Sequence, residues 1–498
     1  MSGGRYRFGE VTRRGLLGAI RPGQVALVAT GAVWAIAVID MAPSESGAAA
    51  ALAGLAATLV IATVPVAGRT IEQWLPVACA WLTRRATGRA RELSPAVAAG
   101  TVVTLAGGGE RRWVSARDRA PAPPAQLRGV RIVELSYRGG VVGAISERRG
   151  RRLTVVLISR APGLALADET EQQQRLSVWA SVLQGAAHGP IRRIQWVQRT
   201  APAQGDGLAR WLHEQRDPQI PLRGSRIAES YLELMAHSAQ AVQEHEVLLA
   251  VQADASRLRR SDDGALERAL LSACERIAAG LERARVRTDR ALTPGGLARA
   301  LRVGYDPYVH AQLAALRAAG RGDELSEPSA WPAATHEQWS CYQADAAVHA
   351  TFEVAAWPRT EVGPAFLDPL VGACEHVRSV AVCFEPLDPA RSLRQAEADV
   401  TREETDRRQR HRFGQLETAR QRQATDATRR REAELAAGHN EVRLAGFVTV
   451  TGREDAELER CCEETVTLAA RSHLELRRLY GQQAHAFAFT LPLCRGLR

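Results

Sequence analysis

The side chains that could do chemistry in this chain are its arginines, histidines, cysteines and acids, because the sequence contains no lysine. All 65 residues counted as Lys+Arg are therefore arginine. A P-loop needs a glycine-rich turn that ends in Gly-Lys-Ser or Gly-Lys-Thr, since the lysine binds the β- and γ-phosphates. The absence of lysine excludes this nucleotide site, a lysine Schiff base and a Ser-x-x-Lys nucleophile.

Histidine and cysteine spacings give no recognised metal or redox motif. His213, His245 and His336 each neighbour a glutamate, but no second histidine follows at the position that would place two zinc ligands on one helix face. The eight cysteines form no Cys-x-x-Cys pair, and Cys461-Cys462 is interpreted as one core-facing thiol beside one half-exposed thiol. The sequence predicts no catalytic residue, no cofactor and no metal site, with reduced thiols in a cytosol-facing protein.

One cluster keeps an enzymatic alternative open. His336, Cys341, Asp345 and His349 are close in sequence, although their spacing matches no known set of metal ligands. A membrane-tethered enzyme is therefore the least favoured class.

The positive charge is concentrated near the N-terminus. The net charge is +10, and residues 1–100 hold ten arginines against five acids, which is half of the excess. The other 398 residues hold 55 arginines against 50 acids. This near balance predicts no specific nucleic-acid site, and leaves only weak, salt-dependent contact between arginine and phosphate.

Two uncharged apolar segments follow the first arginines. Residues 24–39 and 47–66 carry no charge, and roughly 20 such residues at 1.5 Å each cross a bilayer core. The linker 40–46 has two acids and no arginine, whereas arginines flank the outer ends of both segments. The positive-inside rule predicts a two-pass hairpin in the cytoplasmic membrane with both termini in the cytoplasm.

Three other interpretations of these segments are weaker. A soluble core hairpin would show a polar stripe at helical spacing, and neither segment does. A cleaved signal peptide is disfavoured by the arginine-rich leader and by the second span. A twin-arginine signal fits Arg13-Arg14 only superficially, because Pro22 and Gly23 delay the apolar run.

The stretch after the second span predicts an amphipathic helix at the membrane surface. Apolar residues recur at helical spacing over 71–82 and a basic cluster follows. We predict membrane lipids as its partner, with indoles at headgroup depth and guanidinium groups on the inner leaflet. A plain surface helix is the alternative. The predicted membrane-interface residues are Trp34, Trp74, Trp81, Arg84, Arg85, Arg89 and Arg91.

The rest of the 498 residues is long enough for a large cytoplasmic body. Runs rich in β-branched residues over 131–138, 141–147 and 153–159 predict a meander, and later strands alternate with helices. Helices are expected over 167–187, near 205–216 and 225–242, and over 453–479, and a short strand over 485–489. Gly414 is expected to break the charged stretch 391–437 into two helices. We expect an α+β fold in which a transmembrane hairpin precedes a mixed α/β region with ferredoxin-like βαβ units. The predicted organisation is a cytoplasmic leader 1–23, a hairpin 24–67, an interfacial helix and linker 68–126, an α+β domain 127–390, charged helical arms 391–437 and a C-terminal α+β segment 438–498.

Sequence blocks in several regions carry a family resemblance. They include RPGQ at 21–24, GRTIEQWLPV at 68–77, the block at 335–364 and the end LELRRLYGQQAHAFAFTLPLCRGL at 474–497. On these blocks the chain resembles actinobacterial two-pass membrane proteins related to the PrgI family, which accompany conjugation or type IV secretion-like machinery. The soluble part is similar to the non-motor region of conjugative assembly ATPases.

The resemblance implies a non-enzymatic anchor or docking subunit for a separately encoded secretion or conjugation ATPase, with a homo-oligomer as a further expected partner arrangement. No catalytic residue is carried over, because this chain lacks the motor's Walker lysine. The alternative is a membrane subunit of another export system, such as a type VII-like apparatus.

Overall fold

A computed structural model describes most of the chain. The described residues are 22–93, 122–160, 163–164, 167–202, 243–258, 264–310, 327–372, 376–412 and 419–497, with a few isolated positions between 226 and 325. Most of the predicted leader, most of the predicted linker and almost all of the helices expected near 205–216 and 225–242 lie outside these residues.

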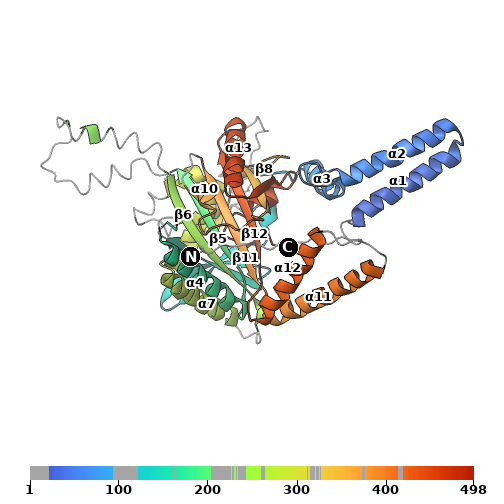
Figure 1. Cartoon of the computed structure of the whole chain (residues 1–498). Coiled ribbons are helices and arrows are strands. Elements are labelled where there is room, and N and C mark those ends of the chain that lie inside the picture. The colour runs from blue at the N-terminus through green and yellow to red at the C-terminus, as the bar shows by residue number, and fades with distance from the viewer. Residues whose placement is uncertain are drawn as a thin grey trace.

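The body is built on one open antiparallel sheet (Figure 1). In the described part of the chain it has 13 strands, in the order β1-β8-β9-β10-β12-β11-β5-β6-β4-β3-β2, while β13 pairs with β10 and β7 with β4. The strands are β1 (Arg91–Leu93), β2 (Arg131–Tyr137), β3 (Gly140–Glu147), β4 (Arg152–Arg160), β5 (Ile191–Pro202), β6 (Gln243–Asp254), β7 (Arg287–Ala291), β8 (Ala334–Glu337), β9 (Tyr342–Ala344), β10 (Ala347–Ala356), β11 (Arg378–Pro386), β12 (Val442–Gly452) and β13 (Glu475–Arg478).

The same strand order occurs twice within this sheet. The first set is β4, β5, β6 and β7, which lie in the order β7-β4-β6-β5. The second set is β10, β11, β12 and β13, which lie in the order β13-β10-β12-β11. In both sets the second strand is at one edge, and these two edges pair with each other, since β5 is antiparallel to β11. The chain therefore repeats a topology although its sequence shows no repeat of fixed period.

Helices cover one face of the sheet. The long ones are α4 (Glu169–Ala187), α7 (Ala265–Arg283) and α13 (Asp455–Arg471), and the short helix α10 (Asp368–Val371) lies on the same face. Alternate residues of the central strands point to this face, so that Val155, Ile194 and Val251 share one core with Leu183 and Leu270. This period of two is what a strand buried between two layers requires.

The other face is covered by α8 (Pro294–Tyr305), α14 (Gln483–Phe487) and the C-terminal segment. Here the strands offer polar side chains as well as apolar ones. Gln195 of β5 is fully buried; its amide donates to the Phe489 carbonyl at 2.7 Å and its oxygen accepts from the Cys494 amide at 2.6 Å. Arg193 donates to the carbonyls of Cys494 and Leu497. A segment without strand pairing is thus held by buried side chains that satisfy its backbone.

The remaining helices project from the body or join its parts. Two of them, α11 (Pro389–Arg412) and α12 (Ala419–Ala436), form the charged arms between β11 and β12. The predicted break of this charged stretch into two helices is confirmed, and the predicted meander is found as β2, β3 and β4.

Two predicted elements near the C-terminus are wrong. One helix was expected over 453–479, but α13 ends at Arg471, where His473 adopts a left-handed φ of 56°, and 475–478 pairs with β10 as β13. A strand was expected over 485–489, where α14 forms instead. The side chain of Gln483 accepts from the Thr351 amide at 2.8 Å, so it takes the place of a strand partner there. β7 was not predicted.

Candidate membrane anchor and its junction with the sheet

Two apolar helices protrude together from the body (Figure 1). α1 spans Pro22–Met41 and α2 spans Glu45–Thr63, and both are long and apolar enough to cross a membrane. Only 11% of the apolar window of α1 and 17% of that of α2 is buried within the chain. A core helix of a soluble protein is mostly buried, and this pair is not, which makes it a candidate membrane anchor.

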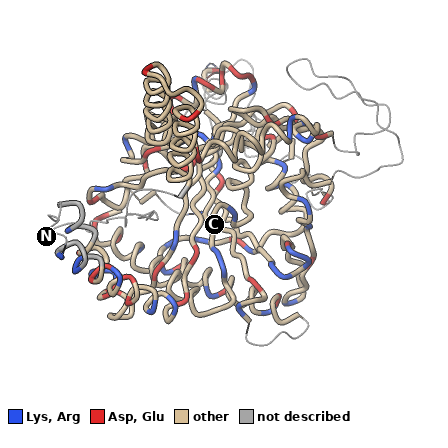
Figure 2. Tube along the Cα trace, turned by 90° about the vertical axis from the view of Figure 1, so that its right-hand side faces the viewer, with Lys and Arg blue, Asp and Glu red and all other residues tan. Residues whose placement is uncertain are grey.

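Charge is nearly absent from the pair. Asp40 and Glu45 are its only charged residues, and both lie at the tip farthest from the body. Figure 2 views the molecule from the side on which the pair protrudes in Figure 1. The helices there are largely tan, the colour of residues without charge, whereas arginine and acid are mixed over the rest of the fold.

Small residues bring α1 and α2 close together. Gly54 of α2 leaves no room for a Cβ beside the ring of Trp34, and Gly31 of α1 leaves none beside Thr58. Gln24 donates to the Ala62 carbonyl at 2.9 Å, so the start of α1 lies beside the end of α2. Close approach at small residues is the usual way in which membrane helices pack. Trp34 thus rests against α2, and its contact with lipid stays a prediction.

The third helix, α3 (Ile71–Ala86), docks on the body through its indoles. Trp74 and Trp81 both pack against Trp339, with their ring centroids 5.8 and 5.2 Å from that of Trp339. The ring centroids of Trp74 and Tyr480 are 6.3 Å apart. Aromatic pairs of this geometry add to the free energy gained from burial. In the structure these two indoles therefore contact protein, and lipid contact through them stays a prediction.

An ion pair fixes the C-terminal end of α3. Arg84 donates from Nε to Glu337 of β8 at 2.9 Å and from Nη2 to the Gly481 carbonyl at 2.7 Å. The Glu337 carboxylate also accepts from the Ala484 amide at 3.2 Å. Burial raises the pKa of Glu337, and the Arg84 charge opposes that rise. Arg84 thus serves the junction, because its guanidinium is shared between a buried carboxylate and a backbone carbonyl.

A second set of contacts fixes the turn between α2 and α3. The Arg477 guanidinium of β13 donates to Glu353 of β10 at 2.7 Å and to the Gly68 carbonyl at 2.9 Å. Arg69 lies 3.7 Å from the same carboxylate. Gly68 has a φ of 74°, a left-handed conformation that glycine adopts at low cost. The chain therefore leaves the apolar pair through a turn tied directly to the sheet.

The other three predicted arginines are exposed. Arg85 lies over the Trp81 ring, with its guanidinium carbon 5.2 Å from the centroid. Arg89 follows the end of α3, and Arg91 lies in β1 opposite His336 of β8. The structure brings these arginines to the same end of α3 as Arg84. Among the four, and within the described part of the chain, only Arg84 forms an ion pair with the body.

The cysteine and histidine candidates separate in the fold. His349 is buried between the Tyr305 carbonyl and Thr451, while Asp345 accepts from two backbone amides. Cys462 is buried and Cys461 is half-buried, which confirms the interpretation of this pair. Among the residues that the structure describes, no three His, Cys, Asp or Glu side chains gather as metal ligands.

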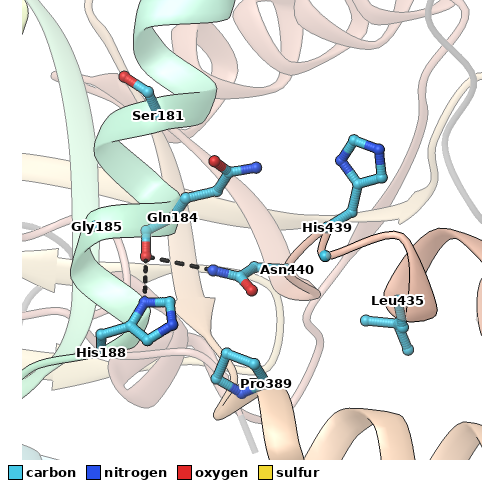
Figure 3. A pocket seen from close by; sticks show the side chains of 9 residues that line it. Ser181, Gln184, Gly185, His188, Pro389, Leu435, His439 and Asn440 are labelled. Carbon is cyan, nitrogen blue, oxygen red and sulfur yellow. Dashed lines mark hydrogen bonds between the residues drawn. The ribbon is translucent and has the colours of Figure 1, made fainter.

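A shallow pocket of about 490 Å³ lies where the charged arms join the sheet body (Figure 3). Its walls are the end of α4 and the turn after α12, and the Gln184 carbonyl accepts from Asn440 at 3.3 Å. Arg431 of α12 links Asp399 of α11 to Glu441 at 3.1 and 2.9 Å. The pocket therefore lies at the base of the arms, and the described residues that line it form no group of converging catalytic side chains.

No family model matches the chain, and no curated protein is similar to it. The junction is thus defined by its geometry. Sequence reasoning missed Glu337, Trp339, Glu353 and Tyr480, which receive α3 and the turn before it. No local spacing identifies them, because their partners are more than 120 positions away in the chain, as for Glu353 and Arg477 at 124 and for Arg84 and Glu337 at 253.

Proposed function

We propose that this chain is a non-enzymatic, membrane-anchored docking subunit, with α1 and α2 crossing the cytoplasmic membrane and the sheet body on the cytoplasmic side. The junction carries the proposal: an exposed apolar pair leads through Gly68 and α3 into a sheet body. Arg477 of the body donates a hydrogen bond to the Gly68 carbonyl, and the buried Glu337 carboxylate forms an ion pair with Arg84 of α3. A structural subunit that transmits position from a membrane to a partner needs such a fixed connection.

The direction of insertion follows from the charges. The tip of the pair carries Asp40 and Glu45, whereas the body end carries the arginines of α3. Positive residues are retained on the cytoplasmic side. Both ends of the pair would then be cytoplasmic, as in a two-pass hairpin.

The sheet body and the arms are the proposed docking part. The repeated strand order supports ferredoxin-like βαβ units that are joined edge to edge through β5 and β11. α11 and α12 extend from one of them as a charged pair with exposed arginines. We propose a secretion or conjugation ATPase as the partner, and a second copy of the chain as a further one.

The first experiment is purification of the tagged full chain from native membranes in mild detergent, followed by identification of bound proteins and an ATP hydrolysis assay. We expect an ATPase to co-purify and to be lost when Arg422 and Arg430 of α12 are changed to Glu. The matched control is Arg148→Glu with Arg290→Glu, two exposed arginines on the sheet body. Retention of the ATPase by the arm variant, or a purified homo-oligomer without any ATPase, would remove the arm-docking proposal.

The alternative assignment is a membrane subunit of a type VII-like export system. The same chain layout would serve there, so cargo distinguishes the two. A deletion strain that loses DNA transfer supports conjugation or type IV-like secretion, whereas loss of a secreted protein supports the alternative.

A further inference from the structure

α3 has two apolar faces, and only one of them touches the body. Trp74, Val77 and Trp81 form the docked face against Trp339 and Gly481. A second set, spaced four, four and three residues apart, lies on a different side of the helix. Its members are exposed and are Ile71, Leu75, Cys79 and Leu82.

The exposure of this second set is large for aliphatic side chains on a folded protein. Leu75 is 61% exposed and Leu82 is 56% exposed, although both belong to a helix that is firmly docked. A continuous apolar stripe of this kind marks a contact surface. We call these four residues the outer stripe.

α3 lies where the α1–α2 pair joins the sheet body. Figure 1 shows α3 almost end-on, with the sheet body on one side and the α1–α2 pair leaving on the other. Gly23 at the start of α1 lies against Glu72, so α3 crosses the pair at its body end. If the pair spans a bilayer, α3 lies along the membrane surface at that end.

Charge completes the surface. Arg85 is one turn beyond Leu82, and Arg89 follows the end of the helix; both are exposed. An aliphatic stripe continued by arginines is the pattern that binds an anionic bilayer surface. The indoles are absent from this surface because they are used for docking.

On the basis of the proposed membrane anchor, we propose that the outer stripe inserts among the acyl chains of the cytoplasmic leaflet while Arg85 and Arg89 bind anionic phospholipid headgroups. α3 thereby fixes the tilt of the sheet body relative to the membrane, since another face of the same helix is docked on that body.

Cys79 provides a native reporter for this contact. It is exposed, whereas the other described cysteines are buried or half-buried. The full chain carrying Cys374→Ser and Cys461→Ser is labelled at Cys79 with an environment-sensitive fluorophore and reconstituted into vesicles. The vesicles contain phosphatidylcholine with about a quarter phosphatidylglycerol, and a lipid-borne nitroxide placed near the headgroups or near the chain ends.

We expect the Cys79 label to shift its emission to the blue and to lose most of its intensity with the shallow nitroxide. A label at Leu52→Cys in α2, made on a Cys79→Ser background, reports the anchor itself through the deep nitroxide. A label at Val466→Cys, an exposed apolar position of α13, on the same Cys79→Ser background is the matched control and stays unquenched.

The outcomes separate the two proposals. Quenching at Leu52→Cys without quenching at Cys79 overturns the α3 inference and keeps the anchor. Absence of quenching at both positions overturns the anchor and the inference with it. The headgroup contact is wrong if Cys79 quenching is the same in pure phosphatidylcholine, or if Arg85→Gln with Arg89→Gln leaves its dependence on phosphatidylglycerol unchanged.

Discussion

Arg84 of α3 donates from Nε and Nη2 to the two carboxylate oxygens of Glu337 on β8, at 2.9 and 3.4 Å, across a sequence separation of 253 residues. Only 6% of the Glu337 side chain is exposed. The link between the apolar pair and the sheet therefore depends on a carboxylate that has been removed from water. A buried charge of this kind is costly when its partner is lost.

Arg84→Ala should loosen the junction. Glu337 would keep its burial and lose its counter-charge, and we expect a loss of about 2 kcal/mol in the free energy of unfolding, measured by urea titration in detergent micelles. Hydrogen exchange over residues 71–86 should rise as well. Arg138→Ala is the matched control, since its pair with Glu275 is exposed and 3.0 Å long. An equal effect of both variants would show that the Arg84 pair has no special role.

Trp339→Ala should release the indoles of α3. The substitution removes the ring that both Trp74 and Trp81 contact, and we expect a cost of about 2–3 kcal/mol for this half-buried site. Trp339→Phe keeps an aromatic surface and should lose less than half of that. Thermal unfolding combined with hydrogen exchange of α3 tests this prediction, and it fails if the Ala and Phe variants behave alike.

His349 should make the folded body sensitive to acid. Its Nε2 donates to the Tyr305 carbonyl at 2.8 Å, and in the neutral ring its Nδ1 accepts from the Thr451 hydroxyl at 2.9 Å. Burial lowers the pKa of His349 from 6.5 to about 4. Since the unfolded chain binds this proton at higher pH than the folded chain, stability is complete above pH 6.5. It falls as the pH drops toward 4, by at most about 3 kcal/mol from this residue.

The measurement is the free energy of unfolding as a function of pH for the wild type and for His349→Gln. The variant is less stable at pH 7, because the hydrogen bonds are imperfectly replaced, but its curve should be flatter between pH 6.5 and 4. The pKa values of His245, His336 and His485 are lowered as well and are common to both proteins, so the difference between the curves isolates His349. Parallel curves would contradict the prediction.

Gln195→Leu should detach the C-terminal segment from the sheet. The amide of Gln195 satisfies the Phe489 carbonyl and the Cys494 amide, and an isosteric aliphatic side chain leaves both buried and unpaired. Two such groups cost about 2–5 kcal/mol. Site-resolved alkylation of the buried Cys494 thiol should become faster in native buffer. Unchanged labelling of Cys494 in Gln195→Leu would contradict this assignment.

Much of the local structure follows from residues that are close together in the sequence. The meander over 131–160, the helix that begins at Asp168 and the charged arms follow from residue periodicity and from turn glycines such as Gly139 and Gly150. The apolar segments at 22–41 and 45–63 are equally easy to recognise, because a long run without charge is visible in the sequence without knowledge of its tertiary contacts. These features depend on residues that are close in sequence.

Elements whose conformation depends on distant partners were not predictable in this way. β13 lies within a helical pattern and becomes a strand because β10 offers it a partner. α14 replaces an expected strand because the Gln483 side chain accepts the hydrogen bond of the Thr351 amide, which a strand partner would otherwise accept. β7 was not recognised in the sequence, and it pairs with β4.

The sequence by itself determined that α3 is an amphipathic helix rich in tryptophan and arginine, placed after two apolar segments. Only the tertiary structure decided which of its apolar residues face the protein. Trp339 and Tyr480 provide aromatic partners for the indoles, so the indoles dock and the smaller aliphatic side chains are left outside. Helical periodicity gives the direction of each face, but the choice between faces depends on the surface that the rest of the fold presents to it.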